Sequence, residues 1–184
     1  MDTLAAKRRE RGEVNEMDIS DFASFDESEL LSFLHSEKPV ERSCAAIHLR
    51  KSKNPTVVDQ LCHQLAIEKK LYTRIALCET LAECAELSIE PLIGLLGRIG
   101  ENQEIKIPET GFYKVSYPLP RDIAARTICR LGIAAILPLE NFIKSSKDMN
   151  ALAQAIDAYG HSLFKQNKVF IFTPTGIIRK ASEE

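Results

Sequence analysis

The sequence contains no tryptophan, no apolar run long enough to cross a bilayer and no large excess of either charge. Its N-terminus, MDTLAAKRRERGEVNEMD, also lacks the apolar core of a signal peptide. We therefore expect a cytoplasmic protein without a membrane partner. The net charge of −2 lacks the basic surplus with which dedicated nucleic-acid binders displace counterions, so it argues against a nucleic-acid partner.

Motifs for catalysis and for metal binding are missing as well. The glycines form no phosphate-binding loop, and no G-x-S-x-G turn is present to carry a nucleophilic serine. The cysteines form no C-x-x-C pair and lie beside apolar residues of expected helices, as reduced core cysteines do: Cys44, Cys62, Cys78, Cys84 and Cys129. A zinc site would need clustered ligands at short spacing. The sequence therefore favours a non-catalytic protein, without metal or cofactor, over an enzyme.

Positive charge gathers near the N-terminus, in Lys7, Arg8, Arg9 and Arg11. A segment this polar buries little apolar surface, so we expect residues 1–25 to be disordered or loosely ordered, with the cluster as a solvated tail. The alternative is an arm that binds nucleic acid.

What the chain does contain is a repeated helical pattern. Four segments, at 41–49, 73–81, 123–132 and 151–160, carry small or apolar residues at their fifth, sixth and ninth places. On a helix these places form one stripe against which a neighbouring helix can pack. The stripes are Ala45, Ala46, Leu49; Leu77, Cys78, Leu81; Thr127, Ile128, Leu131; and Ala155, Ile156, Tyr159.

A second helix is expected after each of the first three segments. Its apolar residues follow the spacing i, i+3, i+7, and Pro91, Pro138 and the pair Asn54-Pro55 mark the helix starts. The stripes are Val58, Leu61, Leu65; Ile89, Leu92, Leu96; and Ile136, Leu139, Ile143. Before them, Asp26 and Glu29 form a capping-box pattern at the start of a half-repeat that would cap the array.

The repeat spacing locates an insertion. Leu49 and Leu81 are 32 residues apart, whereas Leu81 and Leu131 are 50 apart. The excess falls at about 102–119, where apolar and polar residues alternate on both sides of Pro108 and Gly111. This alternation predicts a small β-hairpin or an ordered loop between the second and third helix pairs, with a long surface loop of no particular role as the alternative.

The helical repeats resemble HEAT-like repeats, in particular the short type named after phycobilisome lyases. The first helix of that family carries a pattern like V-R-x-x-A-A-x-x-L-G. The chain matches it at Arg42, Ala45, Ala46 and Leu49, at Arg74 and Leu81, and at Ile123, Leu131 and Gly132, and departs from it at Ala124 and throughout the fourth unit. The resemblance covers about 39–160. It implies an all-α fold, an α-α superhelix (a HEAT/ARM-like solenoid), over residues 26–160.

The resemblance also narrows the function. HEAT-like hydroxylases use His-Glu pairs, and none of His35, His48, His63 and His161 precedes a glutamate. HEAT-like DNA glycosylases use a basic surface with aromatic residues, which the mild acidity and missing tryptophan disfavour. The leading interpretation is a non-catalytic module for protein or peptide binding, or a scaffold. An accessory protein acting on a prosthetic group such as a tetrapyrrole, with Cys62 and His63 in its pocket, is the first alternative. Nucleic-acid binding through the N-terminal arm with Arg121, Arg126 and Arg130 is the second.

Two surfaces are candidates for partner binding. In such a solenoid the second helices line the concave face, where the positions off the core stripe include Asp59, His63, Glu90, Arg98, Glu140 and Lys144. The insertion and its exit add Phe112, Tyr113, Tyr117 and Arg121, which are residue types that anchor interfaces. The alternative is that these are solvated surfaces. Arg42 and Arg74, at the repeat's arginine position, are expected to brace neighbouring repeats.

The C-terminal tail, 161–184, does not continue the helical pattern. Val169 to Phe172 is β-branched and aromatic, and Pro174 and Gly176 break the pattern after it. We expect a short strand here that could pack on the insertion as a third strand.

Overall fold

The computed structural model describes residues 3–99, 119–165, 170–173 and 176–179, without the side chains of the last two ranges. The insertion predicted at 102–119 lies outside the described residues except for Leu119, and so do Phe112, Tyr113 and Tyr117. The packing of the C-terminal tail on the insertion therefore stays a prediction.

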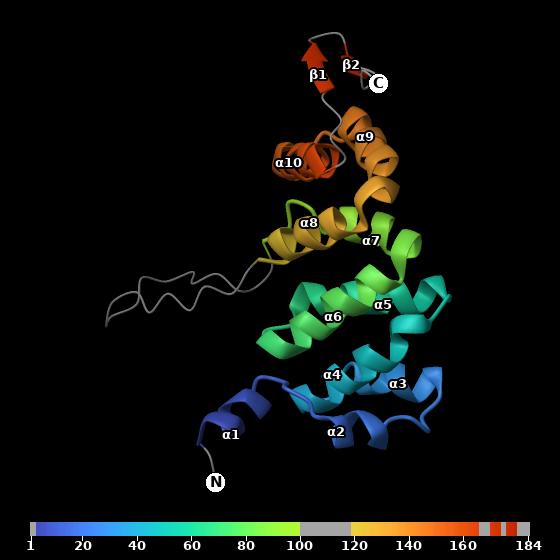
Figure 1. The fold of residues 1–184 in the computed structure, drawn as a ribbon, viewed down its shortest axis with the longest axis vertical. Helices are drawn as coiled ribbons and strands as arrows, with labels where there is room; N and C mark the ends of the chain where they lie inside the picture. Colours follow the sequence, from blue (N-terminus) through green and yellow to red (C-terminus); the bar gives the residue numbers. More distant parts are fainter. Residues whose placement is uncertain (1–2, 100–118, 166–169, 174–175, 180–184) are drawn as a thin grey trace, which may run out of the picture.

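The described chain is almost entirely helical, in agreement with the predicted all-α class (Figure 1). The α-helices are α1 Thr3–Arg9, α2 Glu16–Asp21, α3 Glu27–Phe33, α4 Pro39–His48, α5 Pro55–Ile67, α6 Leu71–Glu83, α7 Ile89–Ile93, α8 Pro120–Leu131, α9 Ile136–Ser145 and α10 Met149–Lys165. Short 3-10 turns, η1 Leu49–Lys51, η2 Ala85–Ser88 and η3 Gly132–Ala135, extend α4 and precede α7 and α9. Among these helices none has the length and apolarity of a membrane span.

The two strands described are β1 Phe170–Thr173 and β2 Gly176–Arg179. They pair antiparallel, with Phe170 opposite Arg179 and Thr173 opposite Gly176. The strand expected in the C-terminal tail is thus present, and its partner among the described residues is the next segment of the tail.

Helix starts follow the capping residues in the sequence. Asp26 accepts the backbone N–H of Glu29 at 2.9 Å, and the Glu29 side chain accepts the N–H of Asp26 at 2.9 Å, which confirms the predicted capping box. Asn54 caps α5 by accepting the N–H of Thr56 at 3.1 Å, with Pro55 as the first helical residue. Proline fits such a place because its missing N–H would have no partner in the first turn.

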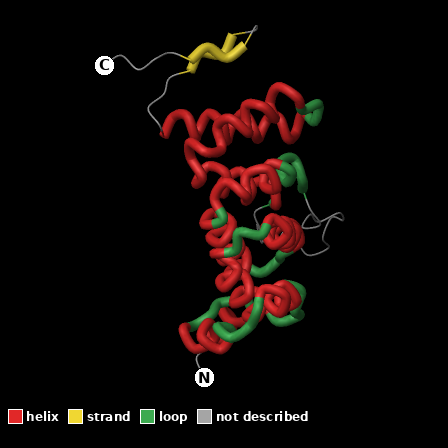
Figure 2. Tube along the Cα trace, turned by 90° about the vertical axis from the view of Figure 1, so that its right-hand side faces the viewer, coloured by secondary structure: helices red, strands yellow, loops and turns green. Residues whose placement is uncertain are grey.

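The helices form two rows along the length of the molecule. One row is α4, α6, α8 and α10, and the second is α5, α7 and α9, with each helix packed against the next of its row (Figures 1 and 2). The predicted stripes lie between the rows, where the largest fully buried side chains include Leu49, Leu61, Leu77, Leu81 and Leu92. One predicted core residue is wrong: Ile156 is 44% exposed. In α10 the buried residues are instead Ala155, Ala158 and Tyr159.

A buried ion pair joins the first two helix pairs. Arg42 on α4 donates from Nε and Nη2 to the carboxylate of Glu68 at 2.7 and 2.9 Å, and the two side chains are 11% and 1% exposed. The same carboxylate accepts the Gln64 amide and the backbone N–H groups of Lys69 and Lys70. Glu68 therefore fixes the turn between α5 and α6 and attaches it to α4.

Arg42 and Arg74, which were expected to brace neighbouring repeats, share one contact geometry. Each arginine donates to the backbone carbonyl six residues before it: Arg42 Nη1 to Ser36 at 2.7 Å, and Arg74 Nε to Glu68 at 2.6 Å. Each thus closes the turn that leads into its own helix. Arg42 and Arg74 are 32 residues apart in the sequence, the same spacing as Leu49 and Leu81.

Hydrogen bonding keeps Glu68 ionised in spite of its burial. Burial raises the pKa of this carboxyl group, but hydrogen bonds from Arg42, the Lys70 N–H and Gln64 together bring the pKa below its ordinary value. A depressed folded-state pKa stabilises the fold above the unfolded-state pKa of about 4.3, and this stability is lost as the pH falls through the folded-state pKa.

Replacing Arg42 by methionine tests this ion pair. R42M leaves a buried carboxylate without its cation, so we expect the free energy of unfolding at pH 7 to fall by about 3–5 kcal/mol, and the difference from wild type to shrink below about pH 4. Denaturant titrations at both pH values measure it. K144M, which removes an exposed i,i+4 pair with Glu140, should change stability by less than about 0.5 kcal/mol. Equal effects of the two substitutions at pH 7 would contradict the assignment.

Candidate functional site

The predicted residues of the second row are spread over three segments. Asp59 and His63 on α5 and Glu90 on α7 are exposed, and Arg98 is exposed after α7. None of their side chains has an ion-pair partner within the described part of the chain. On α9, Lys144 Nζ donates to Glu140 at 2.7 Å, and this is the one ion pair between these predicted residues in the described part of the chain.

Arg121 lies at the entry of α8 instead of on an open surface. Its backbone N–H donates to the carbonyl of Arg98 at 3.1 Å, and its Nε lies 3.6 Å from the Asp122 carboxylate. These contacts hold the start of α8 against the segment that leaves α7. The residue is half-buried and contributes to the packing of the chain.

The basic N-terminal segment differs from the expected solvated tail, because residues 3–25 include α1 and α2. Arg9 forms two hydrogen bonds with the Asp18 carboxylate, at 2.6 and 2.9 Å, and these bonds lower the pKa of Asp18. Arg8 pairs with Glu13 at 3.7 Å, and the guanidinium of Arg11 lies 5.9 Å from the centre of the Tyr72 ring. The arginines of the predicted nucleic-acid arm thus have partners within the chain.

Residues 11–13 occupy the groove between α4 and α6. The Arg11 carbonyl accepts the backbone N–H of Tyr72 at 3.0 Å, and the Gly12 carbonyl accepts the Ser43 hydroxyl at 2.7 Å. The Ser43 and Thr73 hydroxyl oxygens are 2.9 Å apart. Gly12 is buried with φ +92°, a conformation that favours glycine. The first groove of the row is therefore filled by an irregular segment of the chain itself.

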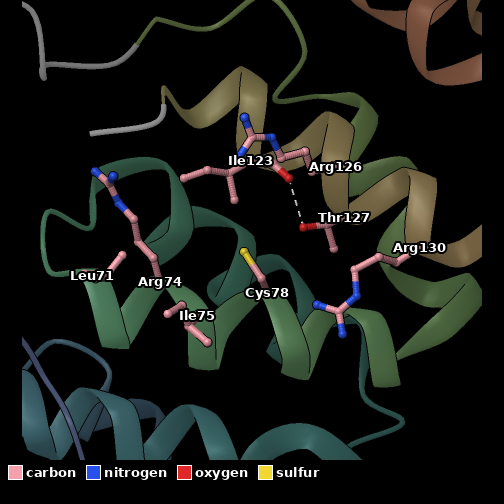
Figure 3. Close-up of a pocket in the computed structure, with 8 residues that line it drawn as sticks. All are labelled: Leu71, Arg74, Ile75, Cys78, Ile123, Arg126, Thr127 and Arg130. Atoms are coloured by element: carbon pink, nitrogen blue, oxygen red, sulfur yellow. Dashed lines mark hydrogen bonds between the residues drawn. The ribbon is translucent and has the colours of Figure 1, made fainter. Parts of the chain in front are cut away.

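The next groove of the same row, between α6 and α8, forms a cavity of about 290 Å³ (Figure 3). Each helix lines it with residues spaced i, i+3, i+4, i+7, the spacing of one helix face. The lining residues are Leu71, Arg74, Ile75 and Cys78 from α6, and Ile123, Arg126, Thr127 and Arg130 from α8. We call this cavity the α6–α8 groove.

The repeat spacing shows how the two grooves differ. Shifts of 32 and 50 residues, which relate Leu49 to Leu81 and Leu81 to Leu131, take Ser43 to Ile75 and Thr73 to Ile123. The two hydroxyl residues beside Gly12 in the first groove thus correspond to two isoleucines in the second. Ile75 remains 43% exposed there. The second groove is therefore lined by apolar side chains at the positions where the first groove has hydroxyl groups that form hydrogen bonds.

Positive charge lies along the α6–α8 groove. Arg126 and Arg130 are exposed, and no described residue forms an ion pair with either. Arg74 is buried and donates to the Glu68 carbonyl. Glu79 follows Cys78 on α6, but it is exposed and does not line the groove. The groove therefore combines arginines with apolar side chains and has no carboxylate in its lining.

The thiol in the groove is not activated. Burial raises the pKa of Cys78, and a hydrogen bond with Thr127 and the charges of Arg130 and Arg74 oppose this rise only in part. Thr127 in turn donates its hydroxyl to the Ile123 carbonyl at 2.9 Å (Figure 3). A nucleophilic cysteine needs the thiolate, so Cys78 serves here as a small apolar surface.

The remaining cysteines agree with the structural role expected for them. All five are free, and burial raises the pKa of Cys44 to about 11 and that of Cys62 still further. Cys62 is buried in the core whereas His63 is exposed, so the two side chains do not converge on one pocket. The described residues also bring together no group of three or more metal-ligating side chains.

Sequence reasoning named Arg126 and Arg130 as possible phosphate contacts but missed the groove that they border. The groove could have been found by aligning the repeated segments of the sequence. That alignment places Ile75 and Ile123 at the positions that Ser43 and Thr73 hold in the preceding pair of helices. Comparison with protein-family models and with curated proteins finds no match for the chain.

Replacing Gly12 by alanine tests whether the first groove is filled as described. A Cβ at this position would overlap the Thr73 hydroxyl and lie 2.9 Å from that of Ser43, so we expect the free energy of unfolding to fall by about 1–3 kcal/mol. The Tyr72 amide should also lose protection from hydrogen exchange, because its acceptor is the Arg11 carbonyl.

The matched control is G160A. No atom lies within 4 Å of a Cβ built at Gly160, which is inside α10, so this substitution should raise stability by about 0.5–1 kcal/mol. Unchanged stability and unchanged Tyr72 exchange in G12A would mean that residues 11–13 do not occupy the groove.

Proposed function

We propose that the chain is a non-catalytic HEAT-like repeat module, an α-α superhelix, that binds another protein or peptide. The helix pairs stacked in two rows, the spacing of 32 residues between Leu49 and Leu81, and the shared contact that Arg42 and Arg74 make with the carbonyl six residues back support a repeat architecture. Such arrays expose the grooves between successive repeats to partners.

The observation that carries the binding function is the α6–α8 groove. It is the second groove of a row whose first groove already holds the turn that ends α1. Its own described lining leaves Ile75 partly exposed and Arg126 and Arg130 without counter-ions. Apolar surface that a partner covers gains about 25 cal/mol per Å². Arginine and large apolar side chains are also the residues that dominate binding energy at interfaces.

The two other functions have less support. A cavity of about 290 Å³ is at the lower limit for a drug-sized ligand, so a tetrapyrrole would extend beyond it, and Cys62 and His63 do not face a common pocket. Nucleic-acid binding through the N-terminal arm is disfavoured, because Arg8 and Arg9 already pair with Glu13 and Asp18. Only Arg126 and Arg130 still support nucleic-acid binding, which is therefore an alternative outcome of the cross-linking experiment below.

Site-specific photo-cross-linking tests the proposed function. A photo-reactive amino acid at position 75, in extract of the source cells, should attach to a discrete protein partner, because this position lies in the groove. The same group at position 137, where Leu137 is 60% exposed on α9, is the control and should not give this product.

Competition makes the cross-linking result specific. An excess of unlabelled wild-type protein should abolish the product at position 75, whereas an excess of R126E/R130E should not. Products that form equally at both positions, or nucleic acid as the attached molecule, would contradict a protein-binding module at this groove.

A further inference from the structure

The two exposed arginines of the α6–α8 groove give it positive charge at two places (Figure 3). Arg126 and Arg130 are four residues apart on α8, and residues at this spacing lie on the same side of a helix with their Cβ atoms about 6 Å apart. In Figure 3 their guanidinium groups point away from each other, and neither forms an ion pair with a described residue. Guanidinium groups bind planar carboxylates through pairs of N–H donors, so a carboxylate is a better partner for these arginines than a hydroxyl or an amide.

The floor beside these arginines is apolar. Leu71, Ile75 and Ile123 line it, and Ile123 is buried whereas Ile75 is 43% exposed. An apolar side chain laid against Ile75 would remove this surface from water. The groove therefore suits an occupant with a negative group and an apolar group side by side.

The first groove shows that the space between neighbouring helices of this row accepts another segment of chain, here the turn that ends α1. Residues 11–13 enter it with a buried glycine and with backbone carbonyls that accept from Tyr72 and Ser43. In the α6–α8 groove the corresponding positions are Ile75 and Ile123, which cannot hold a segment through hydroxyl donors. A segment bound in the α6–α8 groove must then be held by contacts between side chains.

We infer that the α6–α8 groove binds a segment of a partner protein in which acidic residues stand next to a large apolar one. Acidic side chains of the segment pair with Arg126 and Arg130, and the apolar side chain covers Ile75 and Ile123. This inference rests on the proposed protein-binding function and specifies the chemistry of the partner.

A nucleic-acid strand fits the same groove less well. Its phosphates would satisfy the two arginines, but proteins that bind single strands add aromatic side chains on which the bases stack. No aromatic residue is among the lining residues that the structure describes. The isoleucine floor would then face sugar and phosphate and would remain without an apolar partner.

Selection from a display library of random peptides tests the inference with the full-length protein as bait. We expect the enriched peptides to carry aspartate or glutamate beside leucine, isoleucine, valine or phenylalanine. A resynthesised peptide of this kind should bind R126E/R130E at least about tenfold more weakly than wild type, because two favourable charge pairs become repulsive. Its variant with amides in place of the carboxylates should bind wild type equally weakly.

The matched control is K51E/K147E, which changes the net charge by the same amount at two exposed lysines outside the groove. It should bind the peptide like wild type. Equal weakening in both double variants would show a long-range effect of net charge and would overturn the site.

Further outcomes separate the inference from the proposed function. Enriched peptides that are basic or neutral, or whose binding survives R126E/R130E, would overturn the acidic-segment inference and leave a protein-binding module at another surface. Failure to enrich any peptide, with retention of a single-stranded oligonucleotide that is lost in R126E/R130E, would overturn both.

Thermal unfolding distinguishes a partner from the chain itself. Because a partner's segment is absent from the purified protein, R126E/R130E should unfold at the wild-type temperature. A midpoint lowered by more than about 4 °C, with K51E/K147E unchanged, would mean that an acidic segment of this chain occupies the groove, and would overturn the inference.

Discussion

The rest of the structure depends on the buried contact between Arg42 and Glu68. This one ion pair joins α4 to the turn between α5 and α6, and the Glu68 carbonyl in the same turn accepts from Arg74 at the start of the next helix pair. A charge pair buried this deeply is stable only because every oxygen of the carboxylate has donors. It therefore sets the position of α6 relative to α4, and so the shape of the grooves on both sides of α6.

Much of the helical layout could be predicted from the sequence, because it depends on short-range rules. The spacing of Leu61 and Leu65, the caps at Asp26 and Asn54 and the prolines in first turns each act within one or two turns of helix. Which side of α10 is buried could not be predicted in the same way. Ile156 fits the repeat pattern but is exposed, since Ala158 and Tyr159 define the side of α10 that packs on α8 and α9.

The candidate site was harder to predict, because it is a groove that no described segment of the chain fills. Nothing in the sequence around Gly12 indicates that residues 11–13 pack between α4 and α6, where burial and hydrogen bonds outweigh the polar composition that suggested a loose tail. The same contact uses Ser43 and Thr73, whose counterparts in the next groove are Ile75 and Ile123, and among the described residues no segment occupies that groove. Within the described part of the chain, one groove of this row of helices is thus closed by the chain itself, and we propose that the next groove binds an acidic, apolar segment of a partner.

Nuclear magnetic resonance of isoleucine δ1 methyl groups during titration with a selected acidic peptide tests this account most directly. Ile75 and Ile123 report on the α6–α8 groove, whereas Ile133 and Ile156 are exposed elsewhere and serve as internal controls. The account predicts saturable shifts of Ile75 and Ile123 in wild type that are absent in R126E/R130E, with Ile133 and Ile156 unmoved. Shifts of Ile133 or Ile156 with Ile75 and Ile123 unchanged would contradict it.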